Sequence, residues 1–546
     1  MAKEYRNPLD YDFQRHPDTY RQVKLEVIGP VAWIKLDVKE DEGLAQGYQL
    51  KLNSYDLGVD IELADAVNRL RFEHPEVGCV VVSSALEGVF CSGANIFMLG
   101  QSSHTFKVNF CKYTNETRLY IEDASANSGQ TYIAALNGVA SGGGYELPLA
   151  CEEIYLIDDR KSAIALPEVP YLGVLPGTGG ITRVVDKRKL RRDLADIFLT
   201  LAEGVKGSRA VKWGLVDDTF KSSTFWEQVD ARAATVAAGG HPERKGVALE
   251  RVDPVVSDSA FTYQYVTLSL GDDRIATLEL RVPATLPDIP EDPTTLGSGW
   301  WALRAFRELD DALLRLRFHL PQIGVVKVQT RGDLDTILKL DGQLAARAGN
   351  WFVNEVIHHM KRVLKRMDVT SKSFFALIDP GSCFGGSLLE LALAADRQFM
   401  FDGEAVAIAL SAMNNGTLPM GNGLTRLASR FYGDPSHATA LAAHKGRIEA
   451  QEADELGLVT YALDDLDWED ELRLAIEERA SLSPDALTGM EANTRFAGPE
   501  TLETKIFGRL SAWQNWIFQR PNAVGERGAL TLYGQPQSAE YDFDRT

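Results

Sequence analysis

Three consecutive glycines, Gly142 to Gly144, lie between a short apolar run and a segment with the composition of a helix. Proline is tolerated in the first turn of a helix, so Pro148 predicts that this helix begins near the glycines. A glycine turn that enters a helix leaves backbone N–H groups unpaired beside the positive end of the helix dipole. Such groups can hold an anion, or a carbonyl oxygen that gains negative charge during a reaction.

Two carboxylates flank this turn in the sequence. Glu146 lies just inside the expected helix, and Glu168 follows the next expected strand, so a helix–strand hairpin could return both to one cleft. One carboxylate could hold or deprotonate water, while the other, with a raised pKa, donates a proton. Each also has an ordinary explanation, because a glutamate in a first turn often serves only the helix dipole and Glu168 could be a turn residue.

These residues lie in short motifs that together resemble the crotonase (enoyl-CoA hydratase/isomerase) superfamily. A further motif upstream resembles the first oxyanion-hole loop of that family, although Asn95 stands where an acidic residue is usual. The matching motifs are GGGYE at 142–146, LPE at 166–168, LGVLPGTGG at 172–180 and, upstream, FCSGANIFML at 90–99.

The resemblance implies a division of roles among four residues. The backbone N–H groups of Ala94 and Gly143 would bind a thioester oxygen as an oxyanion hole, while Glu146 and Glu168 would handle water and proton. It implies no metal site and no cofactor, since coenzyme A is part of the substrate. The chain also lacks GxSxG, Walker and GxGxxG motifs, so no competing catalytic motif is present.

The segment FCKYTNETR, at 110–118, corresponds to the helix that walls the acyl pocket in this family. Cys111 and Asn115 are one helical turn apart and would share a face, so both are candidates for the substrate pocket. The alternative for Cys111 is a small apolar side chain packed in the core.

An internal repeat at an offset of 243 residues indicates a duplicated domain. We therefore predict an α/β chain in which a crotonase-like fold occurs twice and the second copy is degenerate. At this offset Glu146 falls on Leu389 and Glu168 on Ser411, while Glu390 is one residue out of register. The matched positions include Gly138 and Gly381, Gly142 and Gly385, Gly143 and Gly386, and Pro176 and Pro419.

The predicted domains are a leader and catalytic domain at 1–244, a polar linker at 245–262, and a degenerate domain with a C-terminal helical segment and tail at 263–546. Domains of this family usually assemble, so a homodimer is expected. A whole-chain likeness to a two-repeat branch of the superfamily implies hydrolytic ring cleavage of an aromatic acyl-CoA thioester. A plain enoyl-CoA hydratase or isomerase and a non-enzymatic scaffold remain as alternatives; retention of both glutamates in the first copy argues against the scaffold.

The charge and amino-acid composition of the chain exclude several classes of binding partner and cellular location. The net charge of −20 disfavours nucleic acid and anionic membranes, which need a basic face. No apolar run approaches the roughly 20 residues that span a bilayer, and the polar N-terminus lacks a signal-peptide core, so a cytoplasmic protein is predicted. The five cysteines show no CxxC spacing, and neither disulfides nor a zinc site is expected.

Overall fold

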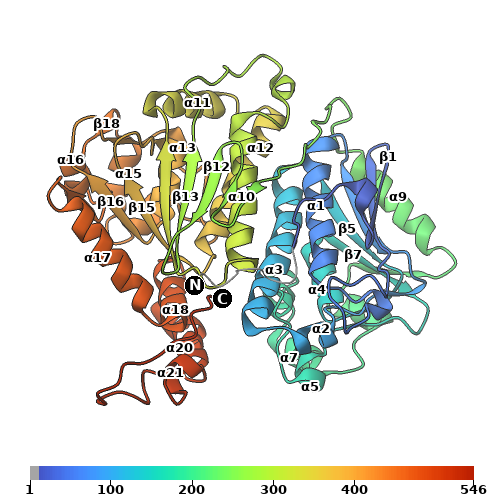
Figure 1. Cartoon of the computed structure of the whole chain (residues 1–546). Helices are drawn as coiled ribbons and strands as arrows, with labels where there is room; N and C mark the ends of the chain where they lie inside the picture. Colours follow the sequence, from blue (N-terminus) through green and yellow to red (C-terminus); the bar gives the residue numbers. More distant parts are fainter. Residues whose placement is uncertain (1–10) are drawn as a thin grey trace. The chain divides into compact units, whose positions relative to one another are not determined.

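The computed structural model describes residues 11–546, which form two compact units (Figure 1). The first unit ends at Arg251 and the second runs from Val252 to Thr546. The division falls inside the segment 245–262 that the sequence marks as a linker. The first ten residues of the predicted leader lie outside the described residues.

The first unit is built on a six-stranded sheet in the order β1-β2-β3-β5-β7-β9. β1 and β2 form an antiparallel hairpin, and every later neighbour is parallel. β3 reads CVVVSS and is buried throughout, as expected for a strand covered on both faces. The strands are β1 (Val23–Ile28), β2 (Val31–Leu36), β3 (Cys79–Ser84), β5 (Thr131–Leu136), β7 (Glu153–Asp158) and β9 (Asp218–Lys221).

Helices cover both faces of this sheet. Successive side chains of a strand point to opposite faces. On one face Cys79 and Ile133 pack against Phe225 and Val229 of α9 (Phe225–Ala237). The alternate residues, such as Val80, are buried as well. The long helices α1 (Leu57–Glu73) and α3 (His104–Asn127) run side by side and contact β2 and β5 (Figure 1).

A small parallel sheet, β4-β6-β8, carries the loops that lead to the candidate site. β6 runs into α4 (Gly143–Ala150), so the helix expected after the glycines is confirmed. Pro148 lies in the second turn of α4 rather than the first. Because the helix ends two residues later, the proline removes few of its backbone hydrogen bonds. The strands are β4 (Gly88–Cys91), β6 (Gly138–Ser141) and β8 (Ile164–Ala165).

The second unit repeats this layout. Its sheet has the order β10-β11-β12-β13-β14-β15-β16-β19; β12 and β13 are antiparallel and the following neighbours are parallel, as in β1 to β9. The strands are β10 (Val255–Val256), β11 (Ala260–Thr262), β12 (Val266–Leu270), β13 (Ile275–Arg281), β14 (Val325–Arg331), β15 (Ser373–Ile378), β16 (Arg397–Phe401) and β19 (Tyr461–Leu463).

Four helices of this unit, α10 (Trp301–Phe318), α12 (Trp351–Asp368), α13 (Gly386–Ala394) and α17 (Trp468–Ser481), follow the strands in the order of α1, α3, α4 and α9. The predicted α/β class is thereby confirmed, and the second unit is compatible with a degenerate copy of the first. The remaining helices and strands are α2 (Ile96–Gln101), α5 (Glu168–Leu172), α6 (Gly180–Thr182), α7 (Arg192–Thr200), α8 (Gly207–Lys212), α11 (Leu334–Ala346), α14 (Arg426–Arg430), α15 (Pro435–Ala442), α16 (Ala450–Glu455), α18 (Pro484–Thr494), α19 (Leu502–Lys505), α20 (Ser511–Ile517), α21 (Pro521–Val524), β17 (Ile408–Ala409) and β18 (Arg447–Ile448). Short 3-10 or π turns occur at Pro17–Thr19, Lys51–Asn53, Arg183–Lys187, Pro293–Leu296, Ala412–Asn414 and Ile506–Leu510.

Among residues 11–546, no helix combines the length and apolar character needed to cross a bilayer.

Close backbone packing of β4 against β6 gives a stability prediction. A Cβ added to Gly138 would lie 2.2 Å from Val89 N, a backbone atom that cannot swing away. We expect Gly138→Ala to destabilise the chain by about 1–3 kcal/mol, as overpacking does. Gly100→Ala in α2 is the matched control, because its methyl would meet nothing within 4 Å. Urea unfolding of the full chain checks this, and equal stability of the two variants would contradict it.

Candidate active site

Two backbone segments meet at the start of α4. A Cβ added to Gly93 would lie 2.8 Å from Gly143 N and 2.8 Å from Ser141 O, and one added to Gly144 would lie 2.1 Å from Cys91 O. Only glycines permit so close an approach. Within residues 11–546, the N–H groups of Ala94 and Gly143 donate to no hydrogen-bond acceptor. The loop after β4 therefore brings one unpaired donor next to another at the positive end of α4.

Asn95, the departure from the family pattern, has a structural explanation. Its Oδ1 accepts from Met98 N at 2.9 Å and so caps α2, while its Nδ2 donates to Gln49 O at 2.7 Å. An acidic side chain could make the first bond but not the second. The amide therefore fixes the loop that carries the Ala94 N–H.

Glu146 is buried in the first turn of α4 and held by three donors. Its Oε1 accepts from Thr178 N at 3.1 Å and Gly180 N at 2.7 Å, and its Oε2 accepts from the Thr178 hydroxyl. A Cβ added to Gly180 would lie 2.7 Å from Oε1. The TGG of the motif LGVLPGTGG thus holds Glu146, a role for Thr178 that the sequence reasoning missed although the motif contained it.

Glu168 begins α5 and lies beside the same helix start. A Cβ added to Gly142 would be 2.8 Å from its Oε1. Its Oε2 is buried, without a hydrogen-bond partner among the residues described. Burial and then the charge of Glu146 raise the pKa of Glu168 to about 7. The two glutamates are therefore brought together around the glycine turn, and Glu168 can carry a proton near neutral pH.

Cys111 and Asn115 reach the same region from α3. The Asn115 amide donates to Gly177 O at 3.1 Å and to Cys111 O at 3.0 Å, so it braces the loop that holds Glu146. Burial, and secondly the charge of Glu146, raise the pKa of the half-buried Cys111 thiol to about 11. Cys111 is thus a neutral thiol close enough to Glu146 to sense its charge.

Known proteins resemble this chain in sequence. Residues 49–245 match the sequence profile of the enoyl-CoA hydratase/isomerase family. The chain is 53% identical over 541 residues to a protein of Aromatoleum evansii named benzoyl-CoA-dihydrodiol lyase, covering 98% of each chain. The chain belongs to the enoyl-CoA hydratase/isomerase, or crotonase, family.

Crotonase-family structures resemble part of the chain. An enoyl-CoA hydratase of Geobacillus kaustophilus HTA426 is 31% identical, with 40% of this chain and 75% of that one covered and a TM-score of 0.35. An enoyl-CoA hydratase of Bacillus anthracis is 23% identical, with 41% and 78% covered and a TM-score of 0.35.

The second unit differs at the equivalent place. α13 has nine residues where α4 has eight, and beyond it β17 matches β8 at an offset of 244, so Glu168 corresponds to Ala412 rather than to Ser411. Glu390 is buried and accepts from Arg426 Nη1 at 2.9 Å. In the first unit Arg183, the counterpart of Arg426, pairs with Glu122 instead. The second unit thus neutralises its glutamate with an arginine, whereas Glu146 is held by neutral donors.

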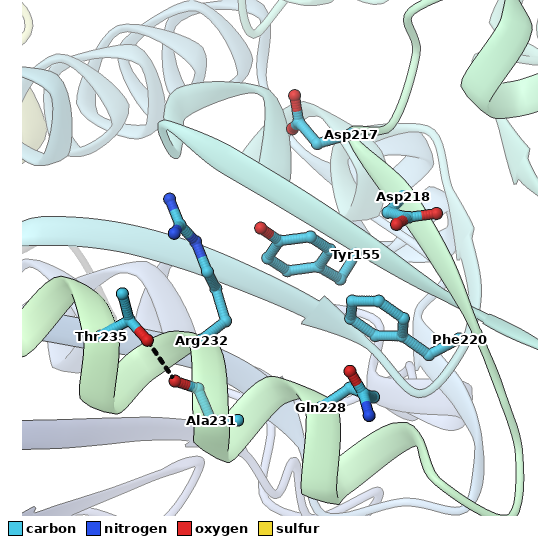
Figure 2. Close-up of a pocket in the computed structure, with 8 residues that line it drawn as sticks. All are labelled: Tyr155, Asp217, Asp218, Phe220, Gln228, Ala231, Arg232 and Thr235. Atoms are coloured by element: carbon cyan, nitrogen blue, oxygen red, sulfur yellow. Dashed lines mark hydrogen bonds between the residues drawn. The ribbon is translucent and has the colours of Figure 1, made fainter.

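Two other features lie apart from these residues. No group of three His, Cys, Asp or Glu in the described part of the chain could hold a metal ion. A surface pocket of about 380 Å³ is lined by residues of β7, β9 and α9 and by Asp217, which precedes β9 (Figure 2). Its Arg232 already pairs with Glu153, Nε to Oε2 2.8 Å, and no candidate site residue lines it.

The raised pKa of Glu168 predicts a pH-dependent gain in stability on its removal. Because the folded pKa, about 7, exceeds the ordinary value of 4.5, the neutral carboxyl is favoured by folding, and that contribution is lost as pH rises through about 7. Glu168→Gln should therefore stabilise the chain more at pH 8.5 than at pH 6, by about 1 kcal/mol. Unfolding titrations at both pH values check this. Exposed Glu227→Gln is the control, and a gain independent of pH would contradict the assignment.

Proposed function

We propose that the chain cleaves the ring of 2,3-epoxybenzoyl-CoA hydrolytically, releasing 3,4-didehydroadipyl-CoA semialdehyde and formate in aerobic benzoate degradation. The observation that carries the proposal is the pairing of two glutamates, one of raised pKa, with two unpaired N–H donors. Whole-length identity of 53% to a protein named benzoyl-CoA-dihydrodiol lyase supports the aromatic CoA thioester as substrate class. Two waters are consumed, and the balance needs no oxidant or reductant.

In this proposal the thioester oxygen is bound by the N–H groups of Ala94 and Gly143. The thioester carbonyl is conjugated to the strained ring, so negative charge that develops in the ring can spread onto that oxygen. A preorganised donor of this kind is worth about 2.7–4 kcal/mol in the transition state. The dipole of α4 adds to the effect, because both donors lie at its positive end.

The glutamates divide the proton transfers. Glu168, protonated near neutral pH, gives its proton to the opening epoxide oxygen through its unpartnered Oε2. Glu146, oriented by Thr178 and Gly180, takes a proton from the attacking water. Cys111 and Asn115 would wall the acyl pocket on the side of α3.

A plain enoyl-CoA hydratase or isomerase would use the same two glutamates, so substrate is what separates the alternatives. A non-enzymatic scaffold would bind no thioester. Coenzyme A enters as part of the substrate, and the proposal requires no metal or redox cofactor. The homodimer and the cytoplasmic location stay predictions, as does the inertness of the second unit.

The reaction is tested by supplying enzymatically made 2,3-epoxybenzoyl-CoA and measuring formate and an aldehyde-bearing CoA ester. We expect one formate for each epoxide consumed. Diol formation without formate would reduce the activity to epoxide hydration. Rapid hydration of crotonyl-CoA with no action on the epoxide would favour the plain hydratase.

The roles of the glutamates predict the effect of removing each acid. Glu146→Gln and Glu168→Gln preserve shape, so each should lower turnover at least ~10²-fold while benzoyl-CoA binding is nearly retained. Wild-type turnover should also fall as pH rises through about 7, where Glu168 loses its proton. Steady-state kinetics and calorimetric titration check this, with Glu227→Gln as control. Turnover at the wild-type rate by folded Glu146→Gln or Glu168→Gln would remove that residue from the mechanism.

A further inference from the structure

Tyr55 contacts both halves of the candidate oxyanion hole. Its backbone brackets the loop that carries the Ala94 N–H: Tyr55 N donates to Gly93 O at 3.0 Å, and Tyr55 O accepts from Asn95 N at 2.8 Å. This segment precedes α1 and is far in sequence from α4. The residues on either side of Ala94 are therefore hydrogen-bonded to the Tyr55 backbone, which fixes the position of the Ala94 N–H between them.

The Tyr55 side chain reaches the other half. A Cβ added to Gly143 would lie 2.0 Å from the Tyr55 hydroxyl oxygen and 2.9 Å from the ring carbon that bears it. Gly143 does not have the left-handed backbone that would itself require glycine. The space for a side chain at Gly143 is thus taken by the Tyr55 hydroxyl, which rests on the first residue of α4.

A buried ion pair holds that hydroxyl. Arg118 Nη2 donates to it at 3.3 Å, and Arg118 Nη1 donates to Asp60 Oδ1 at 2.8 Å. The Thr114 hydroxyl donates to Asp60 Oδ2 at 2.5 Å. Arg118 and Asp60 are each 1% exposed and Tyr55 is 4% exposed, so the three groups have little freedom to move. Nothing in the reaction proposed above uses them.

We propose that Tyr55 is a positioning residue that sets the separation of the Ala94 and Gly143 N–H groups, with Arg118 and Asp60 fixing its hydroxyl. Oxyanion donors act only when each lies about 2.7–3.1 Å from the developing charge, so their mutual spacing matters. The inference deepens the proposed function and rests on it.

The second unit provides a natural contrast. A Cβ added to Gly386, the counterpart of Gly143, would lie 1.8 Å from Asp341 Oδ2. That carboxylate accepts from Ser387 N at 2.7 Å and from the Ser411 hydroxyl at 2.7 Å. An anion of the chain itself thus takes up a donor at the start of α13. In the first unit a neutral hydroxyl supports α4 at the same place and leaves the Gly143 N–H free.

The test measures polarisation of the thioester carbonyl directly. Benzoyl-CoA labelled with ¹³C at the carbonyl is bound to the full chain, and the C=O stretch is read by difference infrared spectroscopy. We expect wild type to lower the stretching frequency, and Tyr55→Phe to lose at least half of that shift. Turnover of the epoxide should fall about 10-fold, while benzoyl-CoA affinity changes less than about 3-fold. Tyr145→Phe is the matched control, because its buried hydroxyl bonds Leu215 O instead.

A double-mutant cycle adds a second measurement. Gly143→Ala should abolish the carbonyl shift, since its methyl meets the Tyr55 hydroxyl. Gly143→Ala combined with Tyr55→Phe should recover part of it, because the nearest atom is then the ring carbon. Recovery of the shift would distinguish a specific spacing role from general damage to the fold.

Each outcome has a defined meaning. A full carbonyl shift in Tyr55→Phe, or strictly additive effects in the cycle, overturns the positioning role even if the epoxide is cleaved. Failure to cleave the epoxide, with the carbonyl shift present in wild type and reduced in Tyr55→Phe, overturns the proposed substrate and leaves the positioning role intact. No carbonyl shift in wild type overturns both.

Discussion

The candidate site depends on the backbone-to-backbone contact between the loop after β4 and the first turn of α4. Gly93 and Gly144 allow the two segments to approach within distances that any side chain would prevent. The contact brings the N–H groups of Ala94 and Gly143, which belong to different segments, next to each other. The carboxylates are then organised around it, because Glu146 extends from the same first turn and Glu168 lies against Gly142.

Around that contact, neutral hydrogen-bond donors and charged side chains occupy different places. Glu146 receives neutral donors from the backbone and hydroxyl of a glycine-rich loop, so its environment orients it without a positive partner. The nearby arginines form ion pairs with other carboxylates instead: Arg183 pairs with Glu122, and Arg118 pairs with Asp60. Because an opposite charge in direct contact would lower the pKa of a carboxyl group, this arrangement allows Glu168 to titrate near pH 7.

The local parts of this design could be predicted from the sequence. The glycine turn, the helix after it and both glutamates lie in short motifs, and the structure brings them together. Tyr55, Asp60 and Arg118 could not be predicted as a group, because Tyr55 and Asp60 lie at the start of α1 and meet Arg118 of α3 only when the two helices pack side by side. The predicted register of the repeat was wrong by one residue at β17 only, because one extra residue in the short helix α13 leaves no mark in a constant-offset comparison. At Pro419 and Arg426 the offset of 243 holds again. The pKa of Glu168 depends on burial and on its distance from Glu146, which no motif encodes.

The buried pair of Glu390 and Arg426 in the second unit has an evolutionary consequence. Arg426 also donates to Asp368 at 2.6 Å, so one arginine neutralises two buried carboxylates. Loss of Arg426 would leave both carboxylates without a positive partner. Breaking a single buried ion pair destabilises a protein by about 3–5 kcal/mol, which is a large part of the free energy of unfolding of a typical domain. Arg426, Glu390 and Asp368 are therefore expected to be replaced together or not at all as the sequence diverges, because a change in Arg426 alone leaves buried charge unpaired.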